Sequence, residues 1–160
     1  MRLATPLRLA LAGTAFALLA ACAGGPVRRV SEPTAQIQQL TVRADGAWDL
    51  QLRLQNYSSI PMRFDSVRLT LNAAQQAAGD VVASPGLDIG PESADVIDVR
   101  VQPATAAKLA VADALASGRA VDYRLDGQIT ATPEKKSQKT FDVRHSSTLN
   151  PAPGLPGVLR

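Results

Sequence analysis

Hydrophobic and polar side chains alternate strictly along residues 48–55. The apolar positions are Trp48, Leu50, Leu52 and Leu54, and the polar positions between them are Asp49, Gln51, Arg53 and Gln55. This period of two predicts a half-buried β-strand, because successive side chains of a strand point to opposite faces. The pattern ends at residues 56–61, N-Y-S-S-I-P, which include several turn-forming residues. Asn56 is expected to hold this turn through its side chain.

The same alternation recurs along most of the chain and predicts further strands. We expect them at residues 37–43, 63–72, 81–83, 87–89, 97–101, 121–129 and 140–147. Asp45-Gly46 predicts a hairpin between the first of these and residues 48–55, whereas residues 73–80 are expected to be a connection. In residues 63–72, Phe64 is out of phase with the alternation of Val67, Leu69 and Leu71. A β-bulge near Asp65-Ser66 would turn all four side chains to the same face. Gly127 marks either another bulge or a close approach of two backbones.

The hydrophobic period changes from two to that of a helix at residues 104–117, which are rich in alanine. One face of the expected helix carries Ala107, Val111, Ala114 and Leu115. Pro103 near its start and Gly118 just past its end agree with the usual boundaries of helices. The helix is short and most of its side chains are small, so it is suited to covering one end of a β-sandwich.

About seven short strands, with turns every 8–12 residues, predict an all-β fold. We expect an immunoglobulin- or fibronectin-like β-sandwich over residues 36–149, with one short helix. Residues 150–160 contain three prolines and two glycines and are expected to form neither regular helix nor sheet. This tail either packs back over a sheet edge or serves as a docking peptide for a partner.

The first 21 residues predict a lipoprotein signal peptide that is removed. Arg2 and Arg8 give it a positive start, and the apolar run that follows is shorter than the ~20 residues of a membrane span. Leu19-Ala20-Ala21-Cys22 matches the bacterial lipobox, so we expect cleavage between Ala21 and Cys22, with S-diacylglycerol and N-acyl groups on Cys22. The alternative is that Cys22 is only a small apolar residue of an ordinary signal. As the single cysteine of the chain, it allows no internal disulfide.

Residues 22–35 are expected to be the lipidated cysteine and a flexible tether, rich in glycine and proline. About 13 flexible residues have an r.m.s. span of roughly 20 Å, which would hold the domain close to the membrane. Ala23 follows the cysteine, where aspartate is associated with inner-membrane retention, so we expect the outer membrane, facing the periplasm. Arg28 and Arg29 either contact anionic head groups or belong to a solvated linker, and the linker is favoured.

The order of features resembles the late embryogenesis abundant type 2 family, also called the water stress and hypersensitive response domain. The resemblance covers residues 35–145 and rests on six pieces: residues 50–56, Ile60-Pro61, residues 67–71, Gly79, residues 90–93 and residues 96–101. It implies a β-sandwich with a short helix and an association with desiccation and stress tolerance. It implies no catalytic activity.

The charge of the chain does not favour nucleic-acid binding. The sequence has 17 basic and 14 acidic residues, and removal of Arg2 and Arg8 would leave 15 against 14. Basic residues occur in no block longer than the pairs Arg28-Arg29 and Lys135-Lys136, whereas a nucleic-acid footprint needs a clustered stripe.

The chain also lacks the usual motifs of an enzyme. His145 is its only histidine and is expected to be structural, so zinc sites and Cys/His nucleophilic pairs are not expected. Four aspartates, Asp45, Asp49, Asp122 and Asp126, lack the spacing of a Ca²⁺ loop and suit solvated strand faces better. We expect no cofactor, metal or small-molecule substrate.

Two functions remain for a membrane-anchored, non-catalytic sandwich. One is a periplasmic lipoprotein that protects the envelope during desiccation or stress. The alternative is an adaptor or assembly factor that holds a periplasmic protein partner at the outer membrane through an edge strand or the proline-rich tail.

Overall fold

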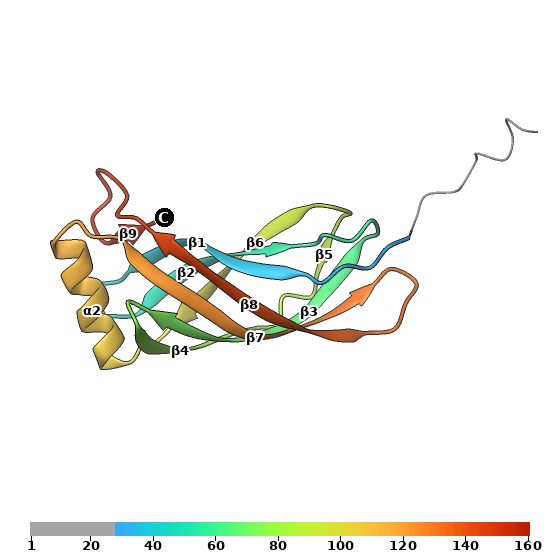
Figure 1. Cartoon of the computed structure of the whole chain (residues 1–160), viewed down its shortest axis with the longest axis horizontal. Coiled ribbons are helices and arrows are strands. Elements are labelled where there is room, and N and C mark those ends of the chain that lie inside the picture. Colours follow the sequence, from blue (N-terminus) through green and yellow to red (C-terminus); the bar gives the residue numbers. More distant parts are fainter. Residues whose placement is uncertain (1–27) are drawn as a thin grey trace, which may run out of the picture.

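Two antiparallel β-sheets packed face to face make up most of the protein (Figure 1). The computed structural model describes residues 28–160, and the predicted signal peptide lies outside them. The elements are β1 (Thr34–Val42), β2 (Trp48–Gln55), β3 (Met62–Ala73), β4 (Gln76–Ala83), β5 (Leu87–Ile89), β6 (Ala94–Val101), α2 (Thr105–Ala116), β7 (Val121–Pro133), β8 (Lys139–Leu149) and β9 (Val158–Leu159).

One sheet has the strand order β6-β2-β1-β9. The other has the order β4-β3-β7-β8, and β5 pairs with the start of β3. The strands run along the long axis of the molecule (Figure 1). The prediction of an all-β sandwich with a single short helix is therefore confirmed for the described residues.

The core is built on the strand whose pattern is clearest in the sequence. Trp48, Leu50, Leu52 and Leu54 of β2 are each at most 1% exposed, while the polar residues between them are only partly covered. Inward side chains of the second sheet complete this core, among them Phe64, Leu71, Leu125 and Ile129. Aliphatic burial thus supplies most of the apolar contact, as expected for a chain with 4% aromatic residues.

The structure shows how the backbone runs at three positions that the sequence marks as a turn, a bulge or a close approach. Asp45-Gly46 forms the predicted turn between β1 and β2, where Gly46 has φ +80° and the Asp45 carboxylate accepts a hydrogen bond from the Ala47 amide (3.0 Å). The register of β3 against β7 shifts between Phe64 and Ser66, which confirms the bulge. Gly127 marks a close approach, because a Cβ there would lie 2.3 Å from the Arg68 carbonyl oxygen.

The prediction that residues 73–80 form a connection is wrong. Only Ala74 and Gln75 turn the chain, with φ values of +49° and +62°, and β4 begins directly after them. Such a two-residue hairpin turn usually contains asparagine or glycine, and neither occurs at these two positions. Pairing of β4 with β3, together with burial of Ala78 and Val81, therefore outweighs the unfavourable turn.

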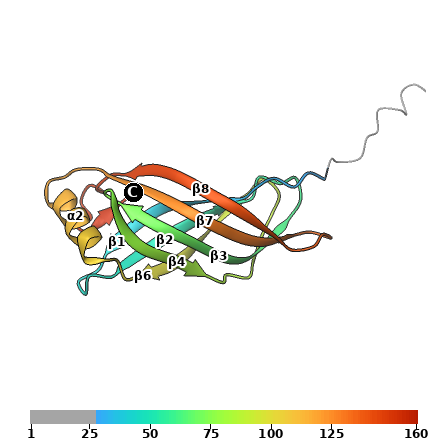
Figure 2. The ribbon, with the colours of Figure 1, turned by 60° about the horizontal axis from the view of Figure 1, so that its bottom comes forward.

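Helix α2 agrees with the predicted helix to within one residue at each end. Ala107, Val111 and Ala114 are buried against the sandwich, and Leu115 is partly buried. The opposite face is solvated, and Leu109 there is 67% exposed. The helix lies across one end of the two sheets, far from the end at which the described part of the chain begins (Figure 2).

The C-terminal tail packs back over a sheet edge, one of the two alternatives predicted for it. Val158 and Leu159 form β9 against Thr41 and Leu40 of β1, so the expectation that the tail contains no regular strand is wrong. Leu159 is completely buried. Burial of this one side chain offsets the poor strand propensity of the residues around it.

A buried hydrogen bond joins the two sheets. The Ile37 amide of β1 donates to the Tyr123 hydroxyl of β7 at 3.0 Å, and Tyr123 is 4% exposed. Ile37 lies where the β1–β2 register shifts, so its amide takes a side-chain partner. Burial raises the pKa of Tyr123 above its ordinary value of 10.0.

Replacing Leu52 by aspartate is expected to unfold the domain, because it would bury an unpaired charge among apolar side chains. Leu109→Asp is the matched control, since the same change on the exposed face of α2 should leave the fold intact. Circular dichroism and thermal unfolding compare the two variants. A folded, cooperatively melting Leu52→Asp variant would contradict the inward assignment of this face of β2.

Tyr123→Phe is expected to lower the free energy of unfolding at pH 7 by about 1–3 kcal/mol, because it leaves the buried Ile37 amide without a partner. The folded state favours the neutral phenol, so the contribution of Tyr123 is complete below pH 10.0 and is lost as the pH rises above that value. The difference between wild type and variant should therefore shrink at alkaline pH. Urea unfolding at pH 7 and above pH 10 measures it, with Tyr57→Phe as the exposed control.

Candidate functional site

The predicted lipidation site, Ala21 and Cys22, lies outside the described residues. The chain is described from Arg28, which follows Cys22 by six positions. The Arg29 amide donates to the Ser59 hydroxyl (2.8 Å), and the Ser31 amide donates to the Ser58 hydroxyl (2.9 Å). The part of the predicted 22–35 tether from residue 28 onward is therefore fixed to the sandwich, and β1 begins at Thr34.

Asn56 forms the centre of the loops at this end of the molecule. It is completely buried, and its side-chain amide donates to the carbonyls of Ile60 (2.9 Å), Ile89 (3.1 Å) and Gly90 (2.9 Å). Its side-chain oxygen accepts a hydrogen bond from the Ser58 amide at 2.8 Å. The predicted turn-holding role of Asn56 is confirmed, and the side chain also joins this turn to the segment after β5.

We call this end of the sandwich the Asn56 end; it comprises residues 28–31, 56–61, 90–93 and 134–138. The last of these segments is the turn between β7 and β8. Arg28 binds the Glu134 carboxylate at 2.8 Å, and this hydrogen bond lowers the pKa of Glu134 below its ordinary value of 4.5. Arg29 lies 3.8 Å from the Glu92 carboxylate. Both arginines that enter the domain are therefore paired with carboxylates.

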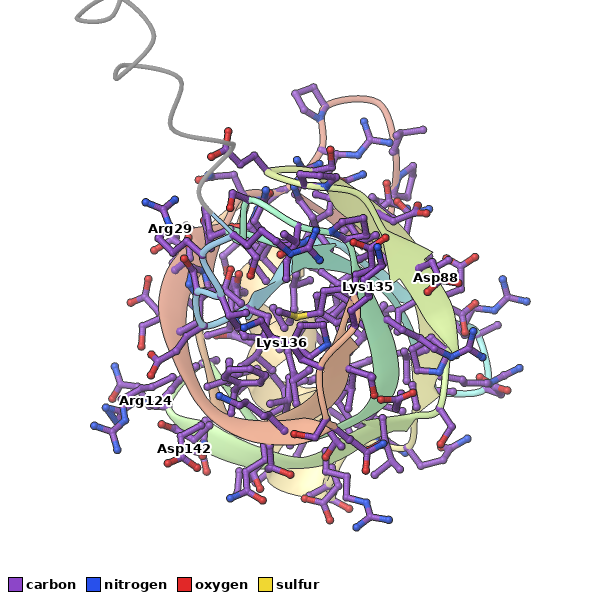
Figure 3. The ribbon with its side chains drawn as sticks, turned by 90° about the vertical axis from the view of Figure 1, so that its right-hand side faces the viewer. Arg29, Asp88, Arg124, Lys135, Lys136 and Asp142 are labelled. Carbon is purple, nitrogen blue, oxygen red and sulfur yellow. The ribbon has the colours of Figure 1, made fainter. Side chains whose placement is uncertain are left out.

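The two lysines of the same turn differ from these arginines. Within residues 28–160, neither Lys135 nor Lys136 lies within salt-bridge distance of a carboxylate, and both are exposed. Figure 3 looks onto the Asn56 end, and the two lysines lie near the middle of that view, with Arg29 toward its left edge. Tyr57, whose carbonyl accepts a hydrogen bond from the Arg29 side chain (3.5 Å), is 49% exposed at the same end.

Asp45 and Asp49 lie among arginines near the β1–β2 turn. Asp45 pairs with Arg100 at 2.5 Å, while Asp49 lies 3.4 Å from Arg43 and 3.9 Å from Arg100. The Ala47 amide, and then the Arg100 charge, lower the pKa of Asp45 below its ordinary value of 3.8. These ion pairs are exposed and contribute little to stability.

The other two candidate aspartates lie on the second sheet. Asp126 is paired with Arg124 (3.4 Å) and Arg144 (3.1 Å), and Asp122 accepts a hydrogen bond from the Thr148 hydroxyl at 2.6 Å. The four aspartates are thus divided between two sheets. Over residues 28–160, no group of three or more His, Cys, Asp or Glu side chains is placed to hold a metal ion.

His145 lies on the inward side of β8, opposite Leu125, and is only partly buried. Its ring is tilted against that of Tyr123, with 5.9 Å between centroids. Among the described residues, its Nε2 atom has no hydrogen-bond partner. With neither a nucleophile nor an acid group bonded to it in this part of the chain, its contacts are those of a packing residue.

The outward side chains of the second sheet are bonded to one another across the strands. We call these bonds the polar ladder: Thr70–Asp80 (3.2 Å), Thr132–Asp65 (2.7 Å), Gln128–Asp142 (3.0 Å), Thr130–Thr140 (3.2 Å), Asp126–Arg144 (3.1 Å) and Asp122–Thr148 (2.6 Å). The alternation of the sequence places these residues outward, but it does not indicate that they pair. Polar atoms of this surface therefore have hydrogen-bond partners within the protein.

No helix within residues 28–160 is long and apolar enough to cross a membrane. A shallow hollow of about 600 Å³ lies over β3, β7 and β8, with Arg124 and Ser146 among its lining residues. It is open, and the residues around it do not include an aligned nucleophile and base.

The fold and these contacts define an all-β sandwich domain. The family described as late embryogenesis abundant protein matches residues 51–146, which run from β2 into β8. Because the match covers more than half of the chain, this protein belongs to the late embryogenesis abundant type 2 family. Members of this family are generally non-enzymatic and stress-related.

Several solved structures are similar to this one but share little sequence with it. A protein from Archaeoglobus fulgidus is 12% identical, with 78% of this chain and 98% of that one covered and a TM-score of 0.45. A protein from Arabidopsis thaliana is 17% identical (81% and 84% covered, TM-score 0.44). A putative late embryogenesis abundant protein is also 17% identical (91% and 79% covered, TM-score 0.49). No curated protein sequence matches the chain. The family assignment rests on the sequence match and not on these structures.

Asn56→Ala is expected to lower the free energy of unfolding by about 3 kcal/mol or more, because it leaves several buried backbone groups without partners. Asn56→Asp has nearly the same size but loses the amide donor, so it should be destabilised as strongly. Asn72→Ala, at a less buried asparagine, should change stability by less than about 0.5 kcal/mol. Urea unfolding of the three variants measures these effects. A stable Asn56→Asp variant would show that packing, and not hydrogen bonding, holds this end.

Proposed function

We propose that this protein is a lipid-anchored periplasmic lipoprotein whose sandwich, of the water stress and hypersensitive response type, protects the cell envelope during desiccation. Membership of the late embryogenesis abundant type 2 family supports the stress-related role. The lipobox 19–22 supports the anchor, with cleavage after Ala21 and acylation of Cys22. Ala23 supports the outer membrane as its location.

The polar ladder is the observation that carries the protective role. A protein that works while water is withdrawn must keep its own polar groups satisfied without water, since an unpaired polar group costs more in a dry environment. Six cross-strand bonds on one sheet face give these side chains partners within the protein. The domain would therefore persist folded in the envelope as water activity falls.

Survival after drying and after osmotic upshift tests this function. A strain lacking the gene should survive less well than its parent, and the wild-type gene should restore survival. Cys22→Ser, which removes the anchor, and Leu52→Asp, which unfolds the sandwich, should both fail to restore it, whereas Leu109→Asp should succeed. Equal survival of the deletion strain and its parent would refute the protective role.

Acylation of Cys22 can be tested separately from survival. Cells fed an alkyne-labelled fatty acid should incorporate it into the wild-type protein but not into Cys22→Ser, and fractionation should place only the wild type in the outer membrane. Label in the serine variant would show that acylation occurs elsewhere.

The alternative, an adaptor that holds a periplasmic partner, depends on which surface is free. The final residues of the tail are engaged with β1, and Leu159 is buried, so the tail as a whole is not a free docking peptide. Leu155 is 46% exposed beside an apolar groove of about 480 Å³ that also contains Leu115. Cross-linking in cells, compared between wild type and Leu155→Asp, tests whether a partner binds at this groove. A point substitution is used because truncating the tail would also remove part of the core.

A further inference from the structure

The Asn56 end must lie near the membrane if Cys22 is acylated, because little chain separates them. Six Cα–Cα steps join Cys22 to Arg28, and at no more than about 3.6 Å each they span at most about 22 Å. Residues 29 and 31 are hydrogen-bonded to Ser59 and Ser58, so this limit applies to the sandwich itself and not to a loose arm. The helix end lies on the opposite side of the molecule (Figure 1), so in this arrangement it would point away from the membrane.

The charge of this end is suited to an anionic surface. The Asn56 end carries four basic side chains, Arg28, Arg29, Lys135 and Lys136, and two acidic ones, Glu134 and Glu92, which lie within salt-bridge distance of Arg28 and Arg29. Lys135 and Lys136 stand at the tip of the β7–β8 turn, which projects furthest at this end (Figure 1). The acidic residues nearby are engaged elsewhere: Asp65 and Asp88 lie 3.6 and 3.4 Å from Arg63. Unpaired lysines near a membrane surface are attracted to anionic lipids.

Tyr57 adds a second feature typical of membrane contact. Its ring is 49% exposed on the same end, and its backbone lies beside Arg29. Tyrosine rings are enriched at membrane–water interfaces, since the ring is apolar while the hydroxyl remains hydrated.

We infer that the Asn56 end docks on the anionic phospholipid surface to which the chain is tethered, with Lys135 and Lys136 binding lipid phosphates and Tyr57 entering the headgroup layer. The distance limit between this end and the membrane rests on the proposed acylation of Cys22. The charge of this end and the exposure of Tyr57 do not depend on it. Docking would hold the sandwich upright, with the polar ladder on its side and α2 at its far end.

Vesicle binding of residues 22–160 with an alkylated Cys22 tests docking without the anchor. Co-sedimentation with phosphatidylcholine vesicles, with and without phosphatidylglycerol, should show binding only to the anionic vesicles at low salt. Lys135→Gln/Lys136→Gln should weaken partitioning by about fivefold per lysine, roughly 25-fold in all. Lys108→Gln/Arg119→Gln removes the same charge from the helix end and should bind like wild type. Tyr57→Ser should weaken binding while leaving its salt dependence unchanged.

Proteolysis of the tethered chain tests the orientation. Cys22, the only cysteine, can be coupled to a maleimide phospholipid in the same two kinds of vesicle. Trypsin cleavage after Lys135 and Lys136 should be several-fold slower on the anionic vesicles, with cleavage after Arg119 at the helix end unchanged. Equal binding by the lysine variant, equal loss in the helix-end control, or equal cleavage rates on both vesicles would overturn the docking. A failure of Cys22 to be acylated in cells would instead refute the anchor, because both vesicle measurements are made without enzymatic acylation.

Discussion

The buried side-chain amide of Asn56 is the polar contact on which one whole end of the sandwich depends. The backbone carbonyls of Ile60 and Ile89 are buried and that of Gly90 is partly buried, and the Asn56 side chain donates to all three. Through the Ser58 amide it also orients the residue that binds Ser31, so the N-terminal segment is held by the same network. An apolar core keeps the sheets together, but it cannot satisfy backbone groups at their ends. One amide of correct geometry does so here.

Strands and helix with regular periodicity could be predicted from the sequence because their burial is periodic. The β2 pattern, the bulge after Phe64 and the helix after Pro103 each follow from which side chains must face the core. The end of β4 could be predicted as a strand at residues 81–83. Its first part, residues 76–80, could not be predicted, because its alanines carry little hydrophobic signal and its turn lacks Asn or Gly. Strand β9 could not, because its place depends on one tertiary contact of Leu159 in a segment whose composition favours irregular structure.

The role of a residue could be predicted where it depends on neighbours in the sequence, but not where it depends on a contact with a distant part of the chain. Asn56 could be assigned from its position after an amphipathic strand. Tyr123 could not, because nothing in the sequence indicates that its hydroxyl meets an amide 86 residues away. Lys135-Lys136 reads in the sequence as an ordinary charged turn. The role that we propose for it in lipid binding depends on its place in the fold. This turn lies beside Arg28, which comes more than one hundred residues earlier in the chain.

If Cys22 is acylated, as we propose, the hydrogen bonds of residues 29 and 31 also determine how strongly the domain is confined near the membrane. Thirteen residues would separate the anchor from the domain if the tether extended to residue 35, whereas only residues 23–27 lie between Cys22 and Arg28. Effective concentration near an attachment point rises as roughly the −3/2 power of linker length, so this shortening increases it about fourfold. Contacts between the Asn56 end and lipid can then be individually weak, in the millimolar range, and still be occupied most of the time.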